Sequence, residues 1–205
     1  VFSAEGDVIA MFTDRWDYTE IVLISIDDGK VVDRLVKGSR SGDLESLHSY
    51  VSGISFSPDG RYLVFVAKSS GKESLFFMDL RKKKVTIKKR FDFYSIMSPA
   101  FSPNSEMVAF SALEGNKRDI FIYDMKSDEV RRITDDRYDD VDVSWFPGST
   151  RLVFSSDRPH PDNSDPRTEP HPYVSDGALM PGDFDYGSYN LHTIDIDSRE
   201  IKPLP

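Results

Sequence analysis

The residues best suited to acid–base or nucleophilic chemistry are few and scattered in this chain. The four histidines, His48, His160, His171 and His192, lie far apart or in a polar segment. No His-Glu-x-x-His sequence is present, which excludes the helical zinc site of many metallopeptidases. The segment Gly-Ser-Arg-Ser-Gly at residues 38–42 places Arg40 where a nucleophile elbow needs serine. The sequence therefore predicts no catalytic residue and no enzyme activity within this segment.

Two acidic clusters contain residue types that can bind metal ions. One lies in residues 159–188 and contains His160, Asp162, Asp165, Glu169 and His171. Its spacing matches no established metal site, and its Pro and Asp residues favour turns. The other lies in residues 133–142 and contains Asp135, Asp136, Asp139, Asp140 and Asp142. Capping of backbone turns is the favoured interpretation there, with a calcium site and a surface for a basic partner as alternatives. We predict neither a metal nor another cofactor.

The charge balance argues against one class of partner. The 205 residues include 26 Lys and Arg against 35 Asp and Glu, a net charge of −9. Nucleic-acid binding needs a basic surface, so we expect no nucleic-acid partner. Seven of the ten residues in RKKKVTIKKR (81–90) are basic, but no aromatic residue lies among them. Lysines commonly protect exposed sheet edges from pairing, so this run predicts the outer strand of a sheet.

The composition gives less information about the cellular compartment of the protein. It has no cysteine, so disulfides and thiolate metal sites are excluded. No apolar run approaches the roughly 18 residues of a membrane span, so we expect no direct membrane insertion. The sequence opens with Val1-Phe2-Ser3, already inside a repeat, and shows no signal peptide. We expect a mature or excised piece of a longer polypeptide.

A sequence motif is present in four copies along the chain. Its copies are VFSAEGDVIAMFT (1–13), SFSPDGRYLVFVA (55–67), AFSPNSEMVAFSA (100–112) and SWFPGSTRLVFSS (144–156). The aromatic anchors Phe2, Phe56, Phe101 and Trp145 are 54, 45 and 44 residues apart. A period of about 40–50 residues built from short strands is typical of propeller blades. We expect Phe56, Phe65, Phe101, Phe110, Trp145 and Phe154 to be buried between blades, since they share one register.

Each copy continues with the same succession of strands and turns. Further strands follow at residues 20–27, 74–81, 119–126 and 190–197, and Asp79, Asp124 and Asp195 share one aligned position where the first copy has Ser25. A hairpin and a last short strand close each unit. Four strands per unit predict an all-β propeller segment of four-stranded antiparallel blades, with almost no helix. We treat residues 1–205 as one domain, with blades at about 1–38, 51–90, 96–134 and 141–205.

The repeats resemble the TolB-like (WD-type) β-propeller family. Its blades carry a pattern close to W/F-S-P-D-G-K-x-I-A-F-x-S-D-R…I-Y-x-x-D…L-T. Two units of this chain match the pattern: residues 55–67 followed by SLFFMDL, and residues 100–110 followed by DIFIYDMKSDEVRRIT. VFSSDR (153–158) and MFTDR (11–15) are similar to the end of its second strand. The family closes rings of six or more blades, so the resemblance implies further blades or domains of the same polypeptide. GSRSGDLESLH (38–48) also resembles a segment of large bacterial proteins that join this propeller to a metallopeptidase-like domain.

The resemblance implies a binding or gating module in a bacterial periplasmic or secreted setting. We predict that a protein or peptide binds the rim formed by the loops between second and third strands and the links between blades. The candidate partner-binding residues are Arg15, Trp16, Asp17, Arg40, His48, Arg118, Arg158, Tyr173, Phe184 and Tyr186. For the Asp-Arg pairs at 14–15 and 157–158, a network joining neighbouring blades is the favoured interpretation, and a ring of charged groups that contacts a ligand is the alternative. A propeller that gates a peptidase domain outside this segment is the alternative function.

An insertion at residues 159–188 separates the second and third strands of the last unit. Its Pro, Asp and Gly content excludes a helix or a central strand. It nevertheless contains Tyr173, Phe184 and Tyr186, which a simple spacer would not need. We expect it to fold over the rim and pack these side chains against blade loops.

Overall fold

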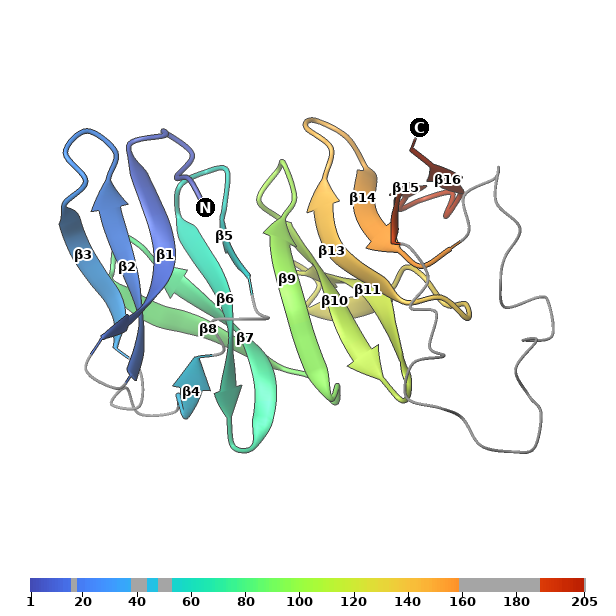
Figure 1. The fold of residues 1–205 in the computed structure, drawn as a ribbon, viewed down its shortest axis with the longest axis horizontal. Helices are drawn as coiled ribbons and strands as arrows, with labels where there is room; N and C mark the ends of the chain where they lie inside the picture. The colour runs from blue at the N-terminus through green and yellow to red at the C-terminus, as the bar shows by residue number, and fades with distance from the viewer. Residues whose placement is uncertain (16–17, 38–43, 48–52, 159–188, 205) are drawn as a thin grey trace, which may run out of the picture.

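The fold is seen in a computed structural model, which describes residues 1–15, 18–37, 44–47, 53–158 and 189–204. In these ranges the chain forms sixteen strands and no helix, and the strands make four antiparallel sheets. The sheets follow one another in chain order, from blue to red in Figure 1. The predicted all-β propeller segment is confirmed. No helix in the described ranges is long and apolar enough to cross a membrane.

The first two sheets comprise residues 8–90. Sheet 1 has the order β1-β2-β3, with β1 at Val8–Arg15, β2 at Tyr18–Ser25 and β3 at Val31–Lys37. Sheet 2 has the order β4-β6-β7-β8, and β5 also pairs with β6. Its strands are β4 (Ser46–Leu47), β5 (Ile54–Phe56), β6 (Tyr62–Ser69), β7 (Lys72–Asp79) and β8 (Lys84–Arg90).

The last two sheets are simple four-stranded meanders, in which strands consecutive in sequence pair with each other. Sheet 3 consists of β9 (Ser95–Phe101), β10 (Met107–Glu114), β11 (Lys117–Asp124) and β12 (Glu129–Arg132). Sheet 4 consists of β13 (Asp140–Trp145), β14 (Arg151–Ser156), β15 (Asn190–Asp195) and β16 (Ile201–Pro203). The hairpins β5–β6, β9–β10 and β13–β14 lie at one end of sheets 2 to 4, and the hairpins β6–β7 and β10–β11 lie at the other end (Figure 1).

The core consists of three apolar layers, one between each pair of neighbouring sheets. Phe65 and Phe76 of sheet 2 pack toward sheet 1, while Val64 and Phe77 on the other face pack toward Phe110 of sheet 3. The next layer brings residues such as Ile120 and Phe154 together. Successive strand residues point to opposite faces, so a sheet covered on both sides needs apolar residues at consecutive positions. This explains the runs LVFVA and IFIY in the central strands.

The predicted burial of the aromatic register is correct at four of six positions. Phe65, Phe110 and Phe154 are fully buried, and Phe101 is nearly so. Phe56 and Trp145 are only half-buried, which corrects the expectation for these two residues. Both lie at the end of a first strand, next to a hairpin turn, and each lines an opening between two sheets.

The aligned aspartates at the ends of the third strands cap the turns that follow. Asp79 Oδ1 accepts the backbone N–H groups of Arg81 (3.1 Å) and Lys82 (3.0 Å). Asp124 and Asp195 accept the N–H groups two and three residues later in the same way. These turns therefore repeat a local structure that one side chain specifies.

The basic run of residues 81–90 forms the outer edge of sheet 2, as predicted. β8 pairs only with β7 and is largely exposed. Two lysines of the basic run also join sheets: Lys83 lies 2.6 Å from Asp33 of sheet 1, and Lys89 pairs with Asp128 in a turn of sheet 3. The lysines thus protect an edge and link adjacent blades.

Candidate functional site

The predicted binding rim is only partly within the described residues. Trp16, Asp17, Arg40, His48, Tyr173, Phe184 and Tyr186 lie outside them, as does the insertion at 159–188. Arg15 ends β1 and pairs with Tyr18 through the backbone, but its side chain is not described. Arg118 and Arg158 are described, and both lie where sheet 3 meets sheet 4. This junction, formed by residues 114–119, 132–140 and 156–158, is called the charged rim below.

Arg158 is buried in the charged rim and does not project into solvent. Its side chain is 8% exposed, and that of its partner Asp140 is 0% exposed. The guanidinium donates to both carboxylate oxygens of Asp140, to Asp136 Oδ2 and, at 2.6 Å, to Ser156 Oγ. It also lies over the rings of Tyr138 and Phe154. These contacts favour a structural role for Arg158, in line with the favoured interpretation of this Asp-Arg pair.

Burial of the Asp140 carboxylate costs free energy, and the paired Arg158 guanidinium offsets that cost. Burial raises the pKa of Asp140 above its ordinary value, although the Arg158 guanidinium acts in the opposite direction. A carboxylate removed from water is stable only with good hydrogen-bonded partners. Because Asp140 begins β13 and Asp136 belongs to the preceding link, Arg158 at the end of β14 fixes the link from sheet 3 against sheet 4.

Asp139 makes a second connection across the same junction. Its Oδ1 accepts the backbone N–H of Arg118 at 2.8 Å, and its Oδ2 lies 3.5 Å from Arg118 Nη1. The backbone N–H of Asp139 in turn donates to Asp157 Oδ1 at 2.8 Å. The Arg118 side chain is 35% exposed, so part of it faces solvent at the rim. Asp139 therefore caps backbone groups, as predicted for the acidic link, and positions a partly exposed arginine.

Basic and acidic side chains alternate on the outer part of the charged rim. Lys117 Nζ lies 3.0 Å from Asp135 Oδ1 and donates to the Asp136 carbonyl at 2.7 Å. Arg132 pairs with Glu114 and, at 3.1 Å, with Asp135. About 30% of the Lys117 and Arg132 side chains remains exposed. This pattern offers paired charges and hydrogen-bond groups to a polar partner.

Asp119 lies beneath these pairs and was not singled out from the sequence. Its side chain is fully buried. Among the residues that the structure describes, none donates a hydrogen bond to Asp119 Oδ2, which lies 3.7 Å from Arg132 and 3.9 Å from Lys117. Burial, reinforced by Asp140 and Asp135, raises its pKa to about 6, although Lys117 and Arg132 oppose that shift. In the other repeats the aligned residues are Glu20, Ser74 and Asn190. A polar residue near the start of each third strand is therefore the sequence signal that could have identified Asp119.

The acidic side chains of the charged rim are engaged by contacts within the protein. In the described ranges, no group of three or more His, Cys, Asp or Glu residues is arranged to hold a metal ion. The acidic residues of the link are engaged instead by Lys117, Arg118, Arg132 and Arg158 or by backbone N–H groups. His192 is buried, and its Nδ1 lies 3.2 Å from the Asn190 carbonyl.

A family model described as the TolB beta propeller domain matches residues 53–161, more than half of the chain. The chain belongs to the TolB β-propeller family. No curated protein matches. Among solved structures, TolB from Acinetobacter baumannii has a TM-score of 0.69 and 17% identity; the similarity covers 99% of this chain and 42% of that one. The putative TolB from Agrobacterium tumefaciens has a TM-score of 0.68 and 17% identity, over 98% of this chain and 62% of that one.

A structure from a study of two prolyl endopeptidases has the same fold, with a TM-score of 0.59 and 13% identity. The similarity covers all of this TolB-family chain and 28% of that chain. The chain thus spans less than two thirds of each of these relatives. At these identities the likeness shows a shared fold.

Proposed function

We propose that this TolB-family propeller is a non-catalytic scaffold that binds a protein or peptide at its charged rim. The observation that carries the proposal is the fixation of the link at residues 133–140. Arg158 holds it through Asp136 and Asp140, and Asp139 holds it against Arg118. A surface ordered before binding loses little conformational entropy when a partner arrives. Lys117, Arg118 and Arg132 remain partly exposed there to make directional contacts.

The same proposal includes a periplasmic or secreted location and further partner-binding residues beyond the charged rim. The TolB relatives support a bacterial extracytoplasmic setting. The predicted contact surface also includes Arg15, Trp16, Asp17, Arg40 and His48. The insertion residues Tyr173, Phe184 and Tyr186 complete that set. Propellers commonly place recognition residues on loops while the sheets provide a rigid support.

The test is a peptide-display selection on the immobilised protein, followed by affinity measurement of the enriched peptides on variants. Arg118→Ala removes the partly exposed guanidinium of the charged rim and should weaken binding at least tenfold. Lys126→Ala is the matched control, because Lys126 is an exposed cation in the turn after β11, at the opposite end of the sheet. Equal affinity of both variants would place the binding surface elsewhere.

A second candidate function is a gating propeller attached to a peptidase domain outside these 205 residues. The fold similarity to the prolyl endopeptidase structure, of which this chain covers 28%, favours it. This function requires catalytic motifs in the flanking sequence of the same polypeptide. Sequencing the complete gene distinguishes the two, because a non-catalytic scaffold needs no such motifs.

A further inference from the structure

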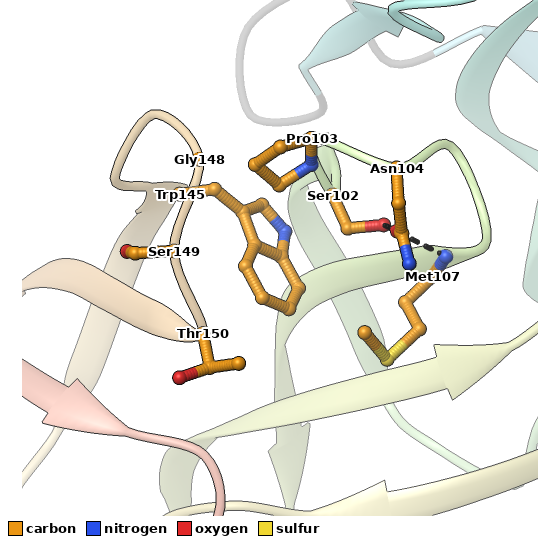
Figure 2. Close-up of a pocket in the computed structure, with 8 residues that line it drawn as sticks. All are labelled: Ser102, Pro103, Asn104, Met107, Trp145, Gly148, Ser149 and Thr150. Carbon is orange, nitrogen blue, oxygen red and sulfur yellow. Dashed lines mark hydrogen bonds between the residues drawn. The ribbon is translucent and has the colours of Figure 1, made fainter.

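A cleft of about 570 Å³ opens between sheets 3 and 4 at the end opposite the charged rim. The hairpin from β9 to β10 forms one wall with Pro103, Asn104 and Met107, and the hairpin from β13 to β14 forms the other. Figure 2 shows the Trp145 indole between the 148–150 segment and Met107. The cleft lies at the first-to-second-strand hairpins, so it is distinct from the surface proposed above.

The hairpin from β13 to β14, which forms one wall of the cleft, departs from the repeat. Between sheets 2 and 3, the Asp59 N–H donates to Ser105 Oγ at 3.1 Å, which brings the two hairpins together. The aligned hydroxyl in sheet 4 is that of Ser149, which instead accepts the Arg151 N–H within its own hairpin at 3.1 Å. The left-handed residue has also moved one place earlier, to Gly148 (φ 62°). The hydrogen bond that joins the hairpins of sheets 2 and 3 is therefore not repeated between the hairpins of sheets 3 and 4.

The floor of the cleft is rigid and apolar. Tryptophan replaces the phenylalanine of the other copies, and the indole N–H donates to the Ala100 carbonyl at 3.0 Å, which fixes the ring orientation. Trp145 and Met107 both pack against the buried cluster that contains Leu152 and Ile194. A Trp face and a Met thioether are favourable surfaces for an aromatic ring.

The charges around the cleft indicate which residues would flank an aromatic ring bound in it. The eight lining residues carry no formal charge. Two carboxylates hold lining side chains from just outside: Glu106 accepts from Asn104 Nδ2 at 2.8 Å, and Asp195 accepts from Thr150 Oγ1 at 3.0 Å. An uncharged interior with acidic groups at its lip is complementary to an apolar group between basic residues.

We propose that this cleft binds an aromatic side chain in a partner protein segment, with basic residues on either side of the aromatic one. The ring lies against the Trp145 indole and Met107, and the flanking cations lie near Glu106 and Asp195. Pockets that accept one aromatic anchor often dominate the affinity of a protein interface. The proposal concerns a site separate from the charged rim, so either can fail without the other.

The test uses the fluorescence of Trp145 in the 205-residue protein with Trp16→Phe, because the chain has two tryptophans. The probes are three capped pentapeptides: Lys-Gly-Phe-Gly-Lys, Lys-Gly-Leu-Gly-Lys and Glu-Gly-Phe-Gly-Glu. The first should give a saturable emission change, with at least tenfold weaker binding of the other two. Absence of saturation with the first peptide, or equal binding of the leucine or glutamate peptide, overturns the proposal.

Two charge-matched variants separate the cleft from general electrostatic attraction. Thr150→Arg places a cation at the exposed mouth of the cleft and should weaken binding of the phenylalanine peptide at least tenfold. Ser127→Arg makes the same charge change at an exposed turn that does not line the cleft and should leave binding unchanged. Thermal melting confirms that both variants fold. Equal weakening by both would show that net charge governs binding and would overturn the proposal.

Discussion

The indole N–H of Trp145 in sheet 4 donates to the backbone carbonyl of Ala100 in sheet 3 at 3.0 Å. A comparable contact joins sheets 2 and 3, where the Phe101 N–H donates to Ser55 Oγ at 3.1 Å. Both bonds connect first strands of neighbouring blades. The apolar layers provide most of the cohesion between blades, and these directional bonds fix how one sheet is placed against the next.

Replacement of Phe110 by alanine tests the apolar layer between sheets 2 and 3. Phe110 is fully buried and its ring lies 5.5 Å from that of Phe91 and 5.9 Å from that of Phe121. The cavity left by Phe110→Ala should lower the free energy of unfolding by about 3–5 kcal/mol, measured by urea denaturation. Phe2→Ala is the control, because Phe2 is 66% exposed and should cost well under about 1 kcal/mol. Similar losses for both would contradict the repeat alignment.

The fold could be predicted from the sequence because its determinants are local and repeated. The alternating strands, the turn residues and the aligned aspartates each specify a short structure, and four copies reinforce one interpretation. Contacts between blades could not be predicted in the same way. The Asp-Arg pair at 157–158 is indistinguishable in sequence from that at 14–15, yet Arg158 is buried because the link supplies Asp136 and Asp140. The cleft beside Trp145 lies between two hairpins that are far apart in sequence, so it could be recognised only once the two hairpins were placed together.

Asp124→Ala should destabilise sheet 3 through the turn after β11. Asp124 Oδ1 accepts the N–H groups of Lys126 at 2.8 Å and Ser127 at 2.9 Å, and these bonds hold its pKa below the ordinary value. Loss of both bonds at a solvent-accessible turn should cost about 1–2 kcal/mol in the free energy of unfolding. Asp124→Asn keeps an acceptor oxygen and should recover about half of the loss. If Asn and Ala destabilise equally, the carboxylate does not act as a cap.

Arg158→Met should be among the most damaging substitutions at the charged rim. It leaves the fully buried Asp140 without its cation, so the free energy of unfolding should fall by about 3–5 kcal/mol in denaturant titrations. Combination with Asp140→Asn should restore part of this loss, since the buried charge is then removed. Lys202→Met is the control, because Lys202 and its partner Glu200 are both more than half exposed and the expected cost is about 0–1 kcal/mol. Equal costs would argue against a buried charge network.

The 205-residue protein should self-associate through the outer faces of sheets 1 and 4. Phe2 and Met11 are exposed on sheet 1 by 66% and 42%, and Tyr189 and Leu191 at sheet 4 by 50% and 53%. Exposed apolar groups of this kind favour contact between molecules. Static light scattering should show an apparent mass that rises with concentration, and Met11→Thr with Leu191→Thr should reduce the rise. A concentration-independent monomer would contradict this expectation.

Asp119 should make stability depend on pH in the direction opposite to most carboxylates here. Its pKa is raised to about 6 in the folded protein, chiefly by burial, against an ordinary value of 3.8. Between these values the folded state binds the proton more tightly than the unfolded state. The contribution of Asp119 to stability is therefore fully present below about pH 4 and is lost as the pH rises through about 6.

The measurement is the difference in free energy of unfolding between the wild type and Asp119→Asn from pH 3.5 to 7.5. The wild type should lose stability relative to this variant as the pH rises from 4 to 7, because asparagine does not titrate. Asp135→Asn serves as a control, because Lys117 lowers the pKa of Asp135 and its contribution is lost only as the pH falls below the ordinary value of 3.8. The stability of the wild type relative to Asp135→Asn should therefore not decrease as the pH rises from 4 to 7. A flat difference curve for Asp119→Asn would mean that water reaches this carboxyl group and that its burial beneath Lys117 and Arg132 is incomplete in solution.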